Sequence, residues 1–139
     1  MEELKPGLVG ERSLVVEEAQ TARHLGSGGV PVYATPMMVL HMEEAAVAAV
    51  DHLLGPGRAT VGTSLDLRHL AATPLGMRVT ARARLVAVDG RALSFEVEAF
   101  DEKERIGEGR HGRAIIDVER FSAKVAAKAA AAKAKDSPL

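Results

Sequence analysis

The sequence contains no cysteine, which excludes a disulfide scaffold, a thiolate metal site and a cysteine nucleophile. It also carries almost no net charge, because 18 basic residues stand against 19 acidic ones and leave a formal charge of −1. This balance creates no overall field that would attract nucleic acid or an anionic membrane, so any basic site has to be local. We therefore expect no nucleic-acid partner and no membrane partner.

Long apolar runs are missing as well. Spanning a bilayer takes about 18 or more consecutive apolar residues, and His41, Glu43 and Glu44 interrupt the best candidate. The N-terminal segment carries Glu2 and Glu3 and lacks the apolar stretch of a secretion signal. The expected compartment is therefore the cytoplasm.

Length and composition are those of one globular domain. The chain has 139 residues, of which 47% are hydrophobic and 27% are charged. This is enough to bury one core and too little to divide comfortably into two. We place a single domain at residues 1–125. Residues 126–139 are rich in Ala and Lys, and we predict a short helix that frays into a tail, helical or disordered.

The longest helix is predicted over Met37–Leu54. Thr35 is a good N-cap residue, and Pro36 suits the first helical position. Gly55-Pro56-Gly57 then ends the helix, because neither residue type favours its continuation.

Strands surround this helix in the sequence. One is predicted before it, at Arg12–Glu17, and beyond residue 60 apolar and polar residues alternate as in half-buried strands. The predicted apolar faces carry Val61, Thr63, Leu65, Leu67 and His69, then Met77, Val79, Ala81, Ala83 and Leu85, then Leu93, Phe95, Val97 and Ala99. Asp89-Gly90 is a strong hairpin signal. One long central helix wrapped by a mostly antiparallel sheet of about five strands is an α+β fold.

Glu43 is the first candidate for chemistry. At 100° per residue it lies on the apolar side of the predicted helix. That side also carries Val39, Ala46, Val47 and Val50, and the opposite, polar side carries His41, Glu44, Asp51 and His52. A carboxylate on an apolar side is costly to bury unless it is paired. Two explanations stay open, a structural Glu satisfied by a backbone donor or by Arg, and a carboxylate kept for catalysis.

His69 and Thr35 complete the candidate group. His69 extends an apolar strand face, and a lone histidine in a core is more often structural than catalytic. If the helix packs on this strand, however, Glu43 and His69 project into the same space, which supplies a base and a proton carrier at low dielectric. Thr35, as an N-cap, would lie beside unpaired N–H groups that stabilise an anion.

Other catalytic motifs are missing. The sequence has no Gly-x-Ser-x-Gly elbow, no P-loop, no dinucleotide fingerprint and no His-Glu-x-x-His segment. His41 and Glu44 are three apart on a helix, but no third metal ligand accompanies them. We expect no metal and no separate cofactor.

Several segments resemble the fluoroacetyl-CoA thioesterase-like family of the hot-dog superfamily, and they are spread over most of the chain. They are Thr21-Ala22-Arg23-His24-Leu25, Val32-Tyr33-Ala34-Thr35, Met42-Glu43, Gly62-Thr63, His69-Leu70-Ala71-Ala72-Thr73-Pro74, Val88-Asp89-Gly90-Arg91 and Glu119-Arg120-Phe121-Ser122-Ala123-Lys124-Val125. The resemblance implies a hot-dog fold and the hydrolysis of acyl-CoA thioesters.

The resemblance also implies the roles of particular residues. The catalytic threonine, glutamate and histidine of the family match Thr35, Glu43 and His69, its site glycine matches Gly62, and an arginine near the site matches Arg113. It further implies a homodimer joined edge to edge, or a tetramer built as a dimer of dimers, with coenzyme A along the subunit interface.

One departure from the family concerns the acyl group. The fluoroacetyl-specific enzyme has a longer segment with an aromatic lid, whereas Gly28-Gly29-Val30 stands here. We therefore predict hydrolysis of short or medium acyl-CoA substrates. Two alternatives stay open, an acyl-CoA hydratase of the same fold, for which Asp51-His52 lies on the wrong helix side, and a non-catalytic acyl-CoA binding module.

Overall fold

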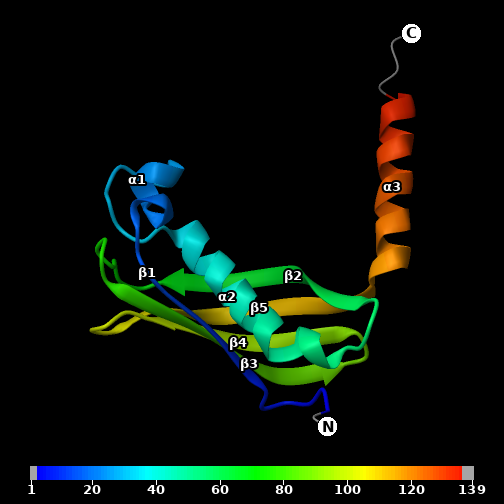
Figure 1. Cartoon of the computed structure of the whole chain (residues 1–139), viewed down its shortest axis with the longest axis horizontal. Coiled ribbons are helices and arrows are strands. Elements are labelled where there is room, and N and C mark those ends of the chain that lie inside the picture. Colours follow the sequence, from blue (N-terminus) through cyan, green and yellow to red (C-terminus); the bar gives the residue numbers. More distant parts are fainter. Residues whose placement is uncertain (1–2, 136–139) are drawn as a thin grey trace.

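The computed structural model describes residues 3–135, and its elements follow the predicted order of strand, helix and further strands (Figure 1). The strands are β1 (Val9–Val15), β2 (Arg58–His69), β3 (Arg78–Asp89), β4 (Ala92–Phe100) and β5 (Arg105–Asp117). The helices are α1 (Ala22–Leu25), α2 (Thr35–Val50) and α3 (Val118–Lys135), with 3-10 turns η1 (Glu18–Gln20) and η2 (Asp51–Leu53). The long helix α2 lies across one face of the sheet (Figure 1).

The strands form one antiparallel sheet in the order β1-β3-β4-β5-β2, so β1 and β2 are its edges. In the β3-β4 hairpin Asp89 pairs with Ala92, and Gly90 and Arg91 make the two-residue turn. Gly90 has a φ of 61°, which glycine adopts without strain. The predicted α+β fold and the predicted hairpin are confirmed.

The core lies between α2 and the inner faces of β3 and β4. The predicted alternation on these strands is confirmed by eight residues that are at most 2% exposed: Val79, Ala81, Ala83, Leu85, Leu93, Phe95, Val97 and Ala99. Burying a Leu or Phe side chain contributes about 1.5–3 kcal/mol, so this surface holds α2 in place. Gly10 lets β1 touch the helix, because a Cβ there would lie 2.0 Å from the carbonyl oxygen of Ala45.

The ends of α2 differ from the prediction of Met37–Leu54. The α-helix runs over Thr35–Val50 and a 3-10 turn continues to Leu53. Ala34, in an extended conformation, is the N-cap, and Thr35 is already helical. The predicted capping role of Thr35 is therefore wrong, and its hydroxyl bonds to another group.

The side of α2 that meets the sheet also differs from the prediction. Its buried residues are Met38, His41, Met42, Ala45, Ala46, Ala49 and Val50. His41, predicted on the exposed side, is 4% exposed, whereas Val47, predicted on the buried side, is 37% exposed. Because α2 is apolar around most of its circumference, a helical wheel alone does not decide which side packs. Glu43 lies at the border of the buried side, with its side chain 34% exposed.

β2 contains a bulge between Gly62 and Ser64, where its pairing with β5 shifts register. An extra residue in one strand reverses the side to which the following side chains point. Thr60 is therefore buried and Gly62 faces α2, although the predicted alternation put Val61 and Thr63 on this side. Past the bulge the alternation agrees with the prediction, since Leu67 packs against the core.

α3 leaves the end of β5 and projects away from the sheet (Figure 1). It is longer than the short helix predicted here and includes residues 126–135, while residues 136–139 lie outside the described part of the chain. The division predicted between residues 125 and 126 falls inside this helix and stays a prediction. Among residues 3–135 no helix is both long and apolar enough to cross a bilayer.

Candidate active site

Thr35 and His69 form a hydrogen-bonded pair where the start of α2 meets the end of β2. Thr35 Oγ1 lies 2.7 Å from His69 Nδ1. Burial lowers the pKa of His69, so the neutral imidazole is favoured. The other ring nitrogen, Nε2, is buried without a hydrogen-bond partner within residues 3–135. An unpaired buried nitrogen costs free energy, and it is typical of a group kept for binding or catalysis.

This pair lines an open cavity of about 320 Å³. The other residues that line it are Ala22, Ser27, Val32, Tyr33, Leu70, Ala71 and Ala72. Its volume is at the lower end of small-molecule sites, and most of its residues are apolar. The cavity therefore suits a small group that presents one polar centre to Thr35 and His69.

Tyr33, which lines this cavity, forms a second polar pair with His41. Both are at most 4% exposed, and the Tyr33 hydroxyl hydrogen-bonds to His41 Nδ1. Burial is the main cause that raises the pKa of Tyr33 and lowers the pKa of His41, so both stay neutral. His41 Nε2 faces the Glu44 carboxylate at 3.9 Å, which favours the proton on Nε2 and leaves Nδ1 to accept from the Tyr33 hydroxyl. The Tyr33 ring meets His69 edge-on, with centroids 6.3 Å apart. The Tyr33 ring thus packs against His69, the candidate catalytic residue.

We expect Tyr33→Phe to lower the free energy of unfolding by about 1–3 kcal/mol, because it leaves the buried His41 Nδ1 without its donor. The double variant Tyr33→Phe with His41→Leu is expected to recover much of this loss, since both polar groups are then gone. Urea unfolding of the three proteins measures the difference. Equal losses in the single and double variants would contradict the pairing.

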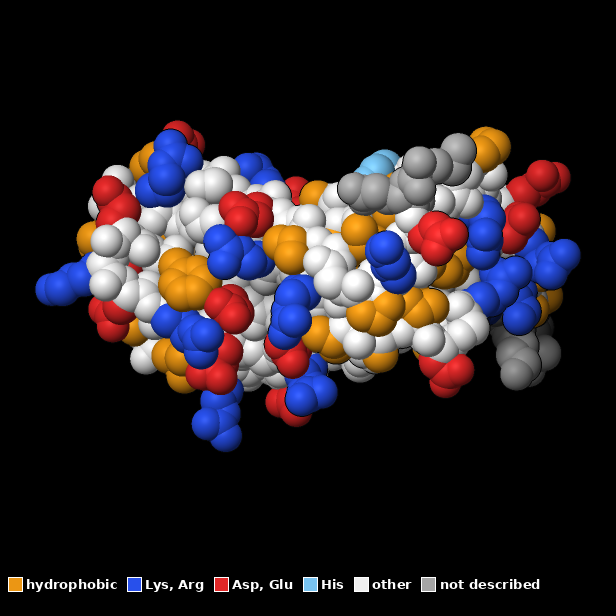
Figure 2. All heavy atoms as spheres, turned by 90° about the horizontal axis from the view of Figure 1, so that it is seen from below, with side chains coloured by type: hydrophobic (Ala, Val, Ile, Leu, Met, Phe, Trp, Pro, Cys, Tyr) orange, Lys and Arg blue, Asp and Glu red, His pale blue; other side chains and the backbone are white. Residues whose placement is uncertain are grey.

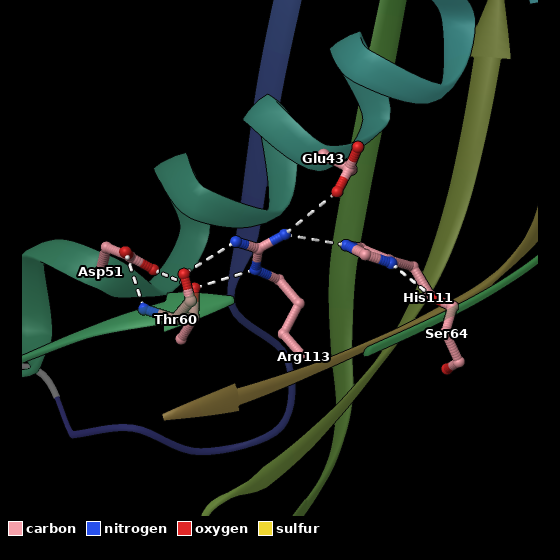
Figure 3. A network of polar contacts seen from close by, with 6 residues as sticks. All are labelled: Glu43, Asp51, Thr60, Ser64, His111 and Arg113. Atoms are coloured by element: carbon pink, nitrogen blue, oxygen red, sulfur yellow. Dashed lines mark hydrogen bonds and ion pairs between the residues drawn. The ribbon is translucent and has the colours of Figure 1, made fainter. Parts of the chain in front are cut away.

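Glu43 belongs to another group of polar residues, held on Arg113 of β5 (Figure 3). Glu43 Oε2 lies 3.7 Å from Arg113 Nη1. Arg113 is 6% exposed, and it donates from Nε to Thr60 Oγ1 at 2.8 Å and from Nη2 to the Thr60 carbonyl oxygen at 2.9 Å. Thr60 in turn donates to Asp51 Oδ1 at 2.6 Å. These hydrogen bonds fix the guanidinium group of Arg113, which in turn orients the Glu43 carboxylate.

The tautomer of His111 follows from its two partners in Figure 3. Its Nδ1 lies 2.9 Å from the carbonyl oxygen of Ser64, which only accepts, so Nδ1 carries the proton. Nε2 then accepts from Arg113 Nη1 at 3.1 Å. Burial, the main cause, lowers the pKa of His111, in keeping with this neutral form. His111 therefore acts as a fixed acceptor that positions Arg113.

Gly62 faces Glu43 across the bulge of β2. A Cβ at this position would lie 2.9 Å from Glu43 Oε2 and 3.4 Å from His111 Cε1, so only glycine leaves the carboxylate its place. Glu43, Gly62, Thr63, Ser64, Leu65 and His111 line a cavity of about 300 Å³. Glu43 is thus both anchored and accessible.

The predicted site residues fall into two groups within one chain. Thr35 and His69 lie together, and so do Glu43, Gly62 and Arg113. The two groups line different cavities. Thr35 and Glu43 are eight residues apart on α2, which is about 12 Å along the helix. One chain therefore does not bring Glu43 into the space that His69 occupies, contrary to the sequence-based expectation.

Comparison with known proteins connects these residues to a family. The family described as Fluoroacetyl-CoA-specific thioesterase matches residues 16–119. The fluoroacetyl-CoA thioesterase of Streptantibioticus cattleyicolor is 43% identical over 132 residues, which cover 88% of this chain and 95% of that protein. The chain belongs to the fluoroacetyl-CoA-specific thioesterase family.

Solved structures agree with this assignment. A mutant of the fluoroacetyl-CoA-specific thioesterase has a TM-score of 0.85 at 40% identity, with 92% of this chain and 99% of that chain covered. A hypothetical protein of Thermus thermophilus, a thioesterase superfamily member, has a TM-score of 0.88 at 32% identity, with 96% and 99% covered. A hot-dog-like protein of Thermanaerovibrio acidaminovorans, 21% identical, shares the fold at 0.81, with 88% and 91% covered. The predicted hot-dog fold, the family and the thioester hydrolase class are confirmed.

Sequence reasoning missed several residues of this family member's site. Tyr33, Thr60 and His111 were not singled out, and His41 was placed on the exposed side of the helix. A signal for one of them was present: His111, Arg113 and Ile115 alternate along β5 and share its inner face. The partners of Tyr33 and Thr60 lie on other elements, so no local pattern reveals them.

Proposed function

We propose that this family member hydrolyses the thioester bond of short or medium acyl-CoA substrates. The observation that carries the proposal is the hydrogen-bonded pair of Thr35 and His69 at an open cavity, with the buried His69 Nε2 unpaired. Structures of the fluoroacetyl-CoA-specific thioesterase are described in complex with acetyl-CoA and with fluoroacetate and CoA. Such ligands support coenzyme A thioesters as the substrate class here.

The proposed roles follow from the position of each group. The Glu43 carboxylate, oriented by Arg113, takes a proton from the attacking water, or attacks the carbonyl itself to form an anhydride that water then cleaves. The Thr35 hydroxyl positions the acyl group and, with the Gly62 backbone, stabilises the oxyanion. The carbon–sulfur bond breaks, and the proton released by the water passes from Glu43 through His69 to the leaving thiolate.

A homodimer is part of this proposal, because Glu43 and His69 do not meet within one chain. β2 is an edge strand, and Leu65 near its centre is 46% exposed. A two-fold axis near Leu65 would pair two copies of β2 antiparallel and bring Glu43 of one subunit toward Thr35 and His69 of the other. Coenzyme A would then lie along the interface, and two such dimers would make the tetramer.

The glycine-rich segment before α2 is the basis for the range of acyl groups that we propose. Ser27 of this segment lines the cavity of Thr35 and His69, and Gly28 and Gly29 supply no apolar wall. An apolar pocket discriminates by about 1–3 kcal/mol per methylene, so a graded chain-length profile is expected. The cytoplasmic compartment and the absence of a metal stay predictions from the sequence. The absence of a separate cofactor also stays a prediction, and it is expected because coenzyme A is part of the substrate.

The test is thiol release from acetyl-, fluoroacetyl-, butyryl-, hexanoyl- and phenylacetyl-CoA. We expect turnover of several, with little preference for fluoroacetyl over acetyl. A steep preference for fluoroacetyl-CoA would show that another group replaces the lid. Hydration of an enoyl-CoA without thiol release would indicate the hydratase, and binding without any turnover would indicate the non-catalytic module.

A further inference from the structure

Arg113 holds Glu43 less closely than its charge would allow. The Glu43 carboxylate lies 3.7 Å from Arg113 Nη1, which is beyond hydrogen-bond distance. On the surface, where Lys and Arg side chains lie among Asp and Glu (Figure 2), Arg82 and Arg84 each reach a glutamate oxygen, at 2.9 and 2.7 Å. Arg113 is only 6% exposed, and a charge removed from water attracts a carboxylate more strongly than an exposed one does. Other contacts therefore keep Arg113 from closing on Glu43.

The hydrogen bonds of Arg113 account for this distance. Its Nε and Nη2 donate to the hydroxyl and to the carbonyl oxygen of Thr60, and its Nη1 donates to Nε2 of His111 (Figure 3). These contacts, at 2.8, 2.9 and 3.1 Å, occupy all three nitrogens of the guanidinium group. Thr60 and the neutral His111 carry no charge, however, so they do not compensate the positive charge of Arg113.

Asp51 supplies a compensating charge from the end of α2. Its Oδ1 accepts from the Thr60 hydroxyl at 2.6 Å, and its Oδ2 accepts from the Thr60 N–H at 3.1 Å. Because a carboxylate only accepts, the Thr60 hydroxyl has to donate to Asp51 and to present a lone pair to Arg113 Nε. Burial lowers the pKa of Arg113, and the charge of Asp51 opposes this shift more than the charge of Glu43 does.

The position of Asp51 is unfavourable for the helix itself. Asp51 is the C-cap residue of α2, where the helix dipole disfavours a carboxylate. It is half-buried, and it lines neither of the two cavities of the candidate site. A purely structural role, joining the end of α2 to β2, explains its bonds to Thr60 but not the distance between Arg113 and Glu43.

We infer that Asp51 is a positioning residue for the reaction, because through Thr60 it holds the Arg113 guanidinium off the Glu43 carboxylate. Glu43 is then oriented by a cation without being hydrogen-bonded to it, so its oxygens are free to take a proton or to attack the thioester carbonyl. A carboxylate that forms two hydrogen bonds to an arginine is a weaker base and a weaker nucleophile. The inference rests on the proposed thioesterase function and adds to it the residue that keeps Glu43 reactive.

The first test is Asp51→Asn, which keeps the shape of the side chain and removes its charge. An amide offers one oxygen to the two donors of Thr60, so the hydroxyl loses its fixed direction and Arg113 turns to Glu43. We expect kcat for acetyl-CoA to fall about tenfold and KM to stay within about twofold, because Asp51 does not touch the substrate. Asp89→Asn, an exposed change at the end of β3, is the control for the lost charge and is expected to match the unmodified protein.

Two further comparisons separate positioning from stability. Thr60→Ser keeps the hydroxyl and Thr60→Val removes it, so the serine variant is expected to exceed the valine variant about tenfold in kcat. In an Arg113→Lys background, which lacks the guanidinium group, Asp51→Asn is expected to change kcat by less than about twofold, since both changes act on one contact. Thermal unfolding shows that each variant is folded. A purely structural Asp51 would lower the thermal midpoint equally in both backgrounds and leave kcat unchanged.

An unchanged kcat in Asp51→Asn, or the same loss of kcat in the Arg113→Lys background, would overturn the inference. Exchange of the Arg113 Nε proton, followed by NMR without substrate, is expected to be faster in Asp51→Asn than in the unmodified protein, and equal rates would overturn the inference as well. An unmodified protein that releases no thiol from any acyl-CoA would refute the thioesterase proposal. The exchange rates would then still decide whether Asp51 holds Arg113 in place through Thr60.

Discussion

The Glu43→Gln variant is expected to fold normally and to lose about 10³-fold or more in kcat, within the range of catalysis by a positioned acid or base. Glutamine keeps the size of the side chain, but its amide neither takes a proton from water nor attacks a carbonyl. It also loses the charge that faces Arg113 Nη1 at 3.7 Å. Thiol release from acetyl-CoA gives kcat and KM, and thermal unfolding shows that the protein is folded.

Glu96→Gln is the matched control for this substitution. Glu96 lies on β4, where it pairs with Arg84 at 2.7 Å, and its side chain is 44% exposed. An exposed pair of this kind contributes at most about 1 kcal/mol, so its loss is expected to leave kcat within about twofold. A normal kcat for Glu43→Gln together with a raised thermal midpoint would show that Glu43 is a structural residue.

Two inactive variants are expected to restore activity when their subunits exchange. In a dimer that holds one Glu43→Gln subunit and one His69→Ala subunit, one site carries both changes and the other carries neither. Random exchange makes half of the dimers mixed, so about a quarter of the original activity is expected in the mixture. Thiol release is measured before and after mixing under conditions that allow exchange.

Each variant mixed with itself is the control and is expected to stay inactive. If Glu43 and His69 act within one chain, no mixed dimer has an intact site and the mixture stays inactive as well. Light scattering on the unmodified protein, expected to give a dimer or a tetramer, shows whether subunits are paired at all. A monomer at micromolar concentration would remove the proposed interface.

Local patterns were sufficient for those features that depend on residue order alone. The alternation in β3 and β4 and the turn at Asp89-Gly90 are confirmed, because side chains of a strand point to opposite sides wherever the strand lies. The family and the hot-dog fold are confirmed as well. They were inferred from short segments, whose residues can be compared with those of the family without a structure. The roles of Thr35, Glu43 and His69 stay predictions.

The tertiary structure decided what depends on contacts between elements. α2 is apolar on several sides, and only its packing against the sheet shows that His41 is buried and Glu43 lies at the border. The bulge in β2, which a residue pattern does not reveal, turns Gly62 toward Glu43. The order of strands brings Arg113 of β5 to Glu43 while Thr35 and His69 meet about two helical turns away, because the first residue of α2 contacts the end of β2 and Glu43, eight residues later, faces β5.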